Sequence, residues 1–167
     1  MFTRHRGERG QAVLEFAVIT PLVLILVFII TDFGIGLAHR VILTNAAREG
    51  ARYGAVGAPS YDGCPQADIV DRIKCKAMAQ GRGLVNDPAA VNVAFLDADS
   101  DGELEPGDAV AVRINYTYKP ITALRLSTTL GWLGFPGITG ITMDSCTDMR
   151  LEQVGSNATI STSSPCD

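Results

Sequence analysis

The stretch GQAVLEFAVITPLVLILVFIITDFG, residues 10–34, decides how the rest of the chain is arranged. Between Ala12 and Ala38 the charged residues are Glu15 and Asp32, and there are no others. A helix needs about 20 predominantly apolar residues to cross a bilayer. The sequence therefore predicts a transmembrane segment at about residues 12–36.

The residues that flank this segment predict its orientation. Arg4, Arg6 and Arg9 precede it, and the positive-inside rule keeps such residues in the cytoplasm. We expect a single-pass protein of the inner (cytoplasmic) membrane with an extracytoplasmic C-terminal part. The alternative is a cleaved secretory signal, whose apolar region spans only about 7–15 residues before a small-x-small site. The run here is longer, and GIGLAHR, residues 34–40, is a poor site of that kind.

The predicted helix continues well beyond the membrane. After the apolar run no helix breaker occurs before Pro59, so we expect one helix over residues 11–57 and a separate domain over residues 58–167. At about 1.5 Å per residue this helix is roughly 70 Å long and must protrude from the bilayer. Its outer half carries two rows of small residues: Ala46, Gly50 and Gly54, and Ala47, Ala51 and Ala55. Such a face docks either on the chain's own sheet or on another subunit, and both alternatives stay open.

The extracytoplasmic part has the pattern of a small α+β domain. Ile69, Ile73 and Ala77 recur at helical spacing and predict a second helix at about residues 67–80. Strand patterns follow as VNVAFL at residues 91–96, AVAVRINYTY at 109–118 and ITMDSCTDMRLE at 141–152. We expect a three-stranded antiparallel sheet with one polar face, packed against the long helix. The apolar connection at residues 120–137 is expected to cover the core or to face a partner.

The cysteines of this part predict disulfides. All four lie on the exported side, where an oxidising compartment lets them pair: Cys64, Cys75, Cys146 and Cys166. Zinc would need close cysteine pairs or nearby histidines, and His5 and His39 both precede the domain. Three pairings are possible. We favour Cys64 with Cys75 and Cys146 with Cys166.

Charge and composition exclude two classes of function. The formal net charge is −4 and the isoelectric point is near 5.1, so nucleic acid is not an expected partner. An enzyme needs a nucleophile with a base, or an open metal site. The domain has no histidine and its cysteines are expected to be paired, so we predict no catalytic residue.

An acidic loop between the first two strands has the spacing of a calcium site. In DADSDGELEPGD, residues 97–108, carboxylates occupy loop positions 1, 3, 5, 7, 9 and 12, with Gly102 at position 6: Asp97, Asp99, Asp101, Glu103, Glu105 and Asp108. This is close to an EF-hand loop, so Ca²⁺ is the candidate cofactor. Asp108 stands where an EF-hand has glutamate, and the flanks read as strands. The alternative is an acidic hairpin turn that binds no metal.

The N-terminal motif resembles a type IV prepilin signal, with Gly10 before Gln11 and Glu15 as the fifth residue after that glycine. Together with NAAREGARYGAV, residues 45–56, it resembles the TadE-like family of pseudopilins and minor pilins of the Tad (Flp) pilus system. PGDAVAVRINYTY, residues 106–118, and the third predicted strand are also similar. The resemblance implies a pilin-like fold, with residues 1–10 as a cytoplasmic leader that prepilin peptidase removes between Gly10 and Gln11.

Glu15 has a physical interpretation beside this resemblance. A carboxylate at membrane depth needs a partner, and the amine that cleavage frees at Gln11 lies one helical turn away. The amine of a neighbouring subunit is an equally good partner, so Glu15 is a candidate assembly residue that sets axial register. The alternative is that Glu15 simply reaches the cytoplasmic headgroups.

These features predict a protein that acts by assembly. The resemblance implies a minor pilin or pseudopilin that joins or primes an adhesive Tad-type filament, with partners among prepilin peptidase, Tad inner-membrane platform proteins and other pilins. The competing interpretation is a permanently membrane-anchored binding or adhesion module with a calcium-stabilised loop.

Overall fold

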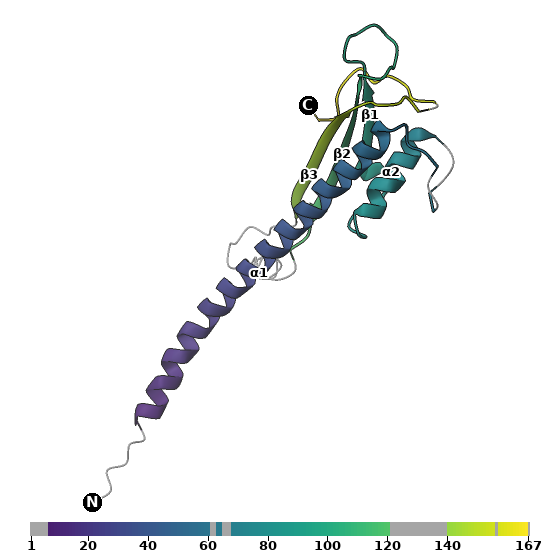
Figure 1. Cartoon of the computed structure of the whole chain (residues 1–167). Coiled ribbons are helices and arrows are strands. Elements are labelled where there is room, and N and C mark those ends of the chain that lie inside the picture. Colours follow the sequence, from purple (N-terminus) through teal and green to yellow (C-terminus); the bar gives the residue numbers. More distant parts are fainter. Residues whose placement is uncertain (1–6, 61–62, 65–67, 121–139, 156, 167) are drawn as a thin grey trace, which may run out of the picture. The chain divides into compact units, whose positions relative to one another are not determined.

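The computed structural model describes residues 7–60, 63–64, 68–120, 140–155 and 157–166. The elements, in chain order, are α1 (Gly7–Ala55), α2 (Ile69–Gln80), the short 3₁₀ helix η1 (Pro88–Ala90), β1 (Val91–Leu96), β2 (Ala109–Tyr118) and β3 (Ile141–Arg150), as labelled in Figure 1. The chain divides into two compact units, residues 1–36 with 119–140, and residues 37–118 with 141–167. Helix α1 contributes to both units.

In the first unit, α1 is apolar on every side. Consecutive large apolar side chains from Leu22 to Ile30 are exposed, and so are Val13, Leu14 and Phe16. A helix that is apolar all round requires an apolar surrounding. By length and composition α1 can cross a membrane, and its most apolar window is not buried within the protein. The predicted transmembrane segment is therefore present as a helix whose apolar side chains are exposed up to Ile30.

The bounds of α1 differ slightly from the predicted 11–57. The helix begins at Gly7, so it includes the last residues of the predicted leader. It ends at Ala55 because Gly57 adopts a left-handed backbone with φ +78°, a conformation that ends helices. The Ala55 carbonyl accepts the backbone N–H groups of Glu152 and Gln153 at 2.8 and 3.1 Å. These bonds also explain why β3 ends at Arg150 and not at the predicted residue 152.

The second unit contains a three-stranded antiparallel sheet in the order β1-β2-β3, which confirms the predicted sheet. β2 lies in the centre, and its Val110, Val112 and Ile114 are fully buried. Asn115 and Thr117, on its opposite face, are exposed. This alternation is the pattern expected of a sheet with one buried and one polar face.

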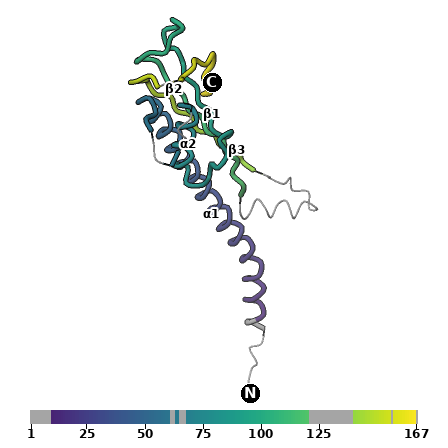
Figure 2. The backbone as a smooth tube through the Cα atoms, turned by 90° about the vertical axis from the view of Figure 1, so that its right-hand side faces the viewer, coloured from purple at the N-terminus to yellow at the C-terminus, as the bar shows by residue number. Residues whose placement is uncertain are grey.

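The two rows of small residues on α1 are buried within this same unit. A side-chain carbon added to Gly50 would lie 3.0 Å from Ala77 Cβ of α2 and 3.4 Å from Val112 of β2. One added to Gly54 would lie 2.9 Å from Ile73 and 3.1 Å from Val110. Figures 1 and 2 show α2 beside the later part of α1. The small-residue face therefore docks on the chain's own sheet and second helix, which resolves the alternative left open above.

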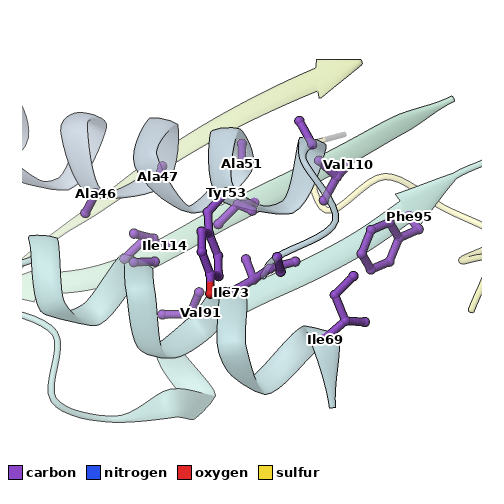
Figure 3. Packing of buried hydrophobic residues seen from close by; sticks show 14 of the residues in the cluster. Ala46, Ala47, Ala51, Tyr53, Ile69, Ile73, Val91, Phe95, Val110 and Ile114 are labelled. Atoms are coloured by element: carbon purple, nitrogen blue, oxygen red, sulfur yellow. The ribbon is translucent and has the colours of Figure 1, made fainter. Parts of the chain in front are cut away.

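The core of the unit lies between these helices and the sheet. Figure 3 shows how the small residues of α1 leave room for larger side chains from α2, β1 and β2. Among the largest fully buried side chains are Phe95, Leu43, Ile69, Ile73 and Ile114. Each side chain of this size contributes about 1.5–3 kcal/mol on burial. The core thus fixes residues 37–55 of α1 against the sheet.

Helix α2 starts two residues later than predicted because Asp68 caps it. The Asp68 carboxylate accepts the Ile69 backbone N–H at 2.7 Å. The predicted apolar stripe is confirmed, since Ile69, Ile73 and Ala77 are all buried. Gly81 ends the helix as expected, and its N–H donates to the carbonyls of Ala77 and Met78.

Two disulfides tie down the irregular segments in the favoured pairing. Cys64 pairs with Cys75 of α2, and Cys146 of β3 pairs with Cys166. The C-terminal tail also pairs with the edge strand β1. Ile160 forms a parallel bridge with Phe95, and the Ser161 N–H donates to the Phe95 carbonyl at 2.8 Å. Most of the apolar connection at residues 120–137 lies outside the described residues.

Candidate functional site

Gly10 occupies an exposed position in α1 where packing does not require glycine. A side-chain carbon added there would meet nothing within 4 Å. Glycine inside a helix costs about 1 kcal/mol relative to alanine. The fold therefore sets no packing requirement for glycine here, and Gly34 of the same helix is equally open. Cleavage after Gly10 stays a prediction.

Gln11 and Glu15 lie on one face of α1, as the spacing predicted. The Gln11 side-chain amide donates to Glu15 Oε1 at 3.2 Å. Leu14, Val18 and Ile19 surround the carboxylate on the exposed helix surface. The structure thus places an acid within an apolar surface and directs it back along the helix toward residue 11.

The acidic loop joins β1 to β2 and is held by its own carboxylates. Asp97 accepts the backbone N–H groups of Ser100 and Gly102 at 2.6 and 2.8 Å. Gly102 has φ +88° and Ser100 has φ +64°, so two left-handed residues fold the chain back on itself. Asp101 accepts the Glu103 N–H at 2.8 Å. Position 6 thus makes the sharp glycine turn that calcium loops need.

Asp108 closes the loop at its base. Its side chain is only 2 % exposed, and its two oxygens accept the N–H groups of Ala98 and Glu105 at 2.8 and 2.9 Å. The burial of this acid was not predicted from the sequence. The available signal was its position directly before β2, two residues from the buried Val110.

The loop brings carboxylates together in two overlapping groups. Oxygens of Asp97, Asp99 and Asp108 lie within 4.8 Å of one another, and so do oxygens of Asp99, Asp101 and Glu105. These are loop positions 1, 3 and 12, and 3, 5 and 9. Glu103, at position 7, belongs to neither group. In calcium loops that position contributes its backbone carbonyl, so the donor set fits Ca²⁺.

The crowding of negative charge shifts the acidity of the loop. A hydrogen bond with Asp97 raises the pKa of Asp99. The charges of Asp101 and Asp99 raise the pKa of Glu105. The pKa of Asp97 is lowered, chiefly by the Gly102 N–H. Asp99 and Glu105 therefore take up a proton more readily than free carboxyl groups, and Asp97 does so less readily.

Comparison with known proteins bears on the N-terminal segment. A family model described as TadE-like protein matches residues 10–52. The match begins at Gly10 and covers Gln11, Glu15 and most of the small-residue rows. The similar stretches noted at residues 106–118 and 141–152 lie outside it. Neither curated proteins nor solved structures gave a significant match.

Proposed function

We propose that this chain, which is TadE-like over residues 10–52, is a minor pilin or pseudopilin of a Tad-type (Flp) pilus, processed between Gly10 and Gln11. The family match is the observation that carries the proposal. It implies association with a Tad pilus system, and TadE-like proteins are generally structural, so we assign no catalytic residue. In this role the chain joins or primes an adhesive filament.

The exposed surface of α1 supports assembly through its membrane half. The small-residue rows are buried inside the second unit, where Gly50 and Gly54 lie against α2 and β2, so they are not available to another subunit. The exposed apolar side chains before residue 31 have no such cover within the described chain. We infer that lipid of the inner membrane covers this surface before assembly. Other pilins replace the lipid when Tad platform proteins extract the chain.

Glu15 would give this assembly its register. A subunit that enters at the wrong height leaves the carboxylate unpaired in apolar surroundings, which costs several kcal/mol. The amine created at Gln11 is the partner, either in the same chain or in a neighbouring one. The bond from the Gln11 side chain to Glu15 supports this pairing, because it directs the carboxylate toward residue 11.

Cleavage by prepilin peptidase tests the proposal in a pair of variants. Gly10→Val should block the removal of residues 1–10, because a β-branched side chain replaces the exposed glycine next to the scissile bond. Gly34→Val is the matched control, since Gly34 lies in the same helix and an added carbon there also meets nothing within 4 Å. Co-expression with the peptidase and electrophoresis should show cleavage of the control and wild type alone. Equal processing of all three chains would contradict the proposed site.

The competing function is a permanently membrane-anchored module whose loop is stabilised by calcium. The two converging groups of carboxylates favour a Ca²⁺ site in either case, and we propose that Asp97, Asp99, Asp101, Glu105 and Asp108 hold the ion with the carbonyl of Glu103. The two functions differ in processing, because a permanent anchor keeps residues 1–10.

A further inference from the structure

The outer face of the sheet carries a recess that the functions above do not use. Its floor comes from β1 and β2, and its wall comes from the C-terminal tail. The lining residues are Asn92, Val93, Ala94, Arg113, Asn115, Ser161, Ser163 and Pro165. All of them belong to the second unit. The recess therefore lies on the side of the sheet away from α1 and α2, next to solvent.

The wall of the recess is fixed in place by several bonds. Arg113 donates from Nη1 to the Pro165 carbonyl and from Nη2 to Asp144, at 2.8 and 2.9 Å. The disulfide between Cys146 and Cys166 anchors the end of the tail to β3. The Ser161 N–H donates to the edge of β1 at Phe95. A site whose wall is already ordered loses little conformational entropy when a ligand binds.

The polar groups in the recess offer hydrogen bonds of both kinds. Asn92 and Asn115 are exposed, and within the described residues neither carboxamide has a hydrogen-bond partner. Each carboxamide carries two donors and an acceptor. The Ser161 hydroxyl donates to the Ser163 carbonyl at 3.2 Å and keeps its oxygen free to accept. Paired donors and acceptors of this kind match the neighbouring hydroxyl groups of a sugar.

Charge argues for a neutral ligand. Arg113 is the cation among the lining residues. Its Nη2 is paired with Asp144, while its Nε is buried and has no hydrogen-bond partner within the described residues. An added anion would compete with that carboxylate, while a hydroxyl-rich neutral ligand would leave the pair intact. The chain as a whole also carries a net negative charge.

We propose that this recess binds a neutral saccharide, with the carboxamides of Asn92 and Asn115 as its principal contacts. The proposal rests on the proposed function in one respect only: an adhesive filament would bring the recess to saccharides on a cell or matrix surface. Binding by the isolated chain and processing of its leader are separate measurements, so either proposal can fail alone.

NMR titration of the full chain tests this proposal. The chain is kept in micelles of a detergent that carries no sugar, and the probes are glucose, galactose and N-acetylglucosamine, with glucuronic acid and inorganic phosphate as anionic probes. We expect a neutral sugar to shift the side-chain amide signals of Asn92 and Asn115. Asn92→Ala and Asn115→Ala should each weaken binding about fivefold or more, the effect of one lost hydrogen bond.

Matched variants separate the recess from general effects on folding. Asn86→Ala should bind as the wild type does, because that carboxamide is engaged by the Gly83 carbonyl and lies outside the recess. Cys146→Ser with Cys166→Ser should weaken binding by releasing the wall, while Cys64→Ser with Cys75→Ser should not. If loss of the Cys146–Cys166 disulfide unfolds the domain, Arg113→Lys is the milder variant, because it weakens only the hydrogen bonds of Arg113 to the wall. Absence of shifts at Asn92 and Asn115 with every neutral sugar, or shifts with the anions alone, would overturn the proposal.

Discussion

Gln11 and Glu15 lie one turn apart on α1, and the side-chain amide of Gln11 donates to Oε1 of Glu15 at 3.2 Å. The bond directs the carboxylate toward residue 11, on a helix surface that Leu14, Val18 and Ile19 make apolar. After cleavage the same residue would also carry a positively charged α-amine. Under the proposed function, the relationship between these two residues would link processing to assembly.

Removing the charge of Glu15 tests this link. Glu15→Gln keeps the size of the side chain but cannot form an ion pair with the amine. We expect the anchor to remain in the membrane and incorporation into sheared filaments to fall about tenfold or more. The α-amine of Gln11 would be left without its counter-charge, and an uncompensated charge in an apolar interior costs several kcal/mol. Immunoblots of the filament and membrane fractions measure both quantities. Glu152→Gln, an exposed acid outside the anchor, is the control. Normal incorporation of Glu15→Gln would refute the role assigned to Glu15.

The small-residue face should tolerate no large side chain at Gly54. Gly54→Leu would drive its side chain into Ile73 and Val110, which lie 2.9 and 3.1 Å from the added carbon. Overpacking of this kind lowers the free energy of unfolding by about 1–3 kcal/mol. Thermal unfolding followed by near-ultraviolet circular dichroism should show a lower midpoint. Gly34→Leu, where an added carbon meets nothing, should leave the midpoint of the domain unchanged. Equal midpoints in the two variants would mean that this face does not dock as described.

Asp108 should stabilise the fold whether or not calcium binds. Asp108→Ala removes the buried carboxylate that accepts the N–H groups of Ala98 and Glu105. Each lost hydrogen bond lowers the free energy of unfolding by about 0.5–1.5 kcal/mol. Asp148→Ala removes an exposed acid from β3 and should change stability little. Urea unfolding in the presence of EGTA compares the two, and similar midpoints would contradict the closing role of Asp108.

The pH dependence of the loop follows from the direction of its pKa shifts. Folding raises the pKa values of Asp99 and Glu105 above 3.8 and 4.5, so the stability they contribute is present below those values and is lost as the pH rises. Asp97 acts in the opposite sense, because its lowered pKa contributes stability that is lost as the pH falls. Bound Ca²⁺ would remove the repulsion at neutral pH.

The proposed calcium site therefore makes a pH-dependent prediction. Calcium should raise the melting midpoint more at pH 7 than at pH 4, because the ligands must be deprotonated, and Asp99→Asn should reduce the rise. Melts of the wild type with calcium and with EGTA at both pH values measure this. If calcium does not raise the melting midpoint at pH 7, the loop is an acidic turn that binds no metal.

Much of the fold could be predicted because its signals are local. The alternation in Ala109–Tyr118 depends on which side chains face the core, so the bounds of β2 agree with the prediction. The tail was harder to predict, because its pairing comes from the backbone N–H of Ser161, which sequence polarity does not reveal. The hydrogen bond from Ser145 to Thr44 of α1 could not be predicted for a related reason, since the two residues are far apart in sequence.

The candidate sites divide in the same way. The spacing of Gln11 and Glu15, and of the loop carboxylates, is a property of short segments and was visible in the sequence. The choice between docking the small-residue face on the chain itself or on another subunit was not. That choice depends on whether α2 and β2 fit against Gly50 and Gly54, which only the packed structure shows.

The N-terminus of the native protein tests the central claim most directly. Mass spectrometry of the chain purified from the membranes or filaments of the cells that make it measures this end of the protein. The proposed function predicts a chain that begins at Gln11, with residues 1–10 removed. A native chain that keeps those residues, in cells with an active prepilin peptidase, would contradict it and favour the permanently anchored module.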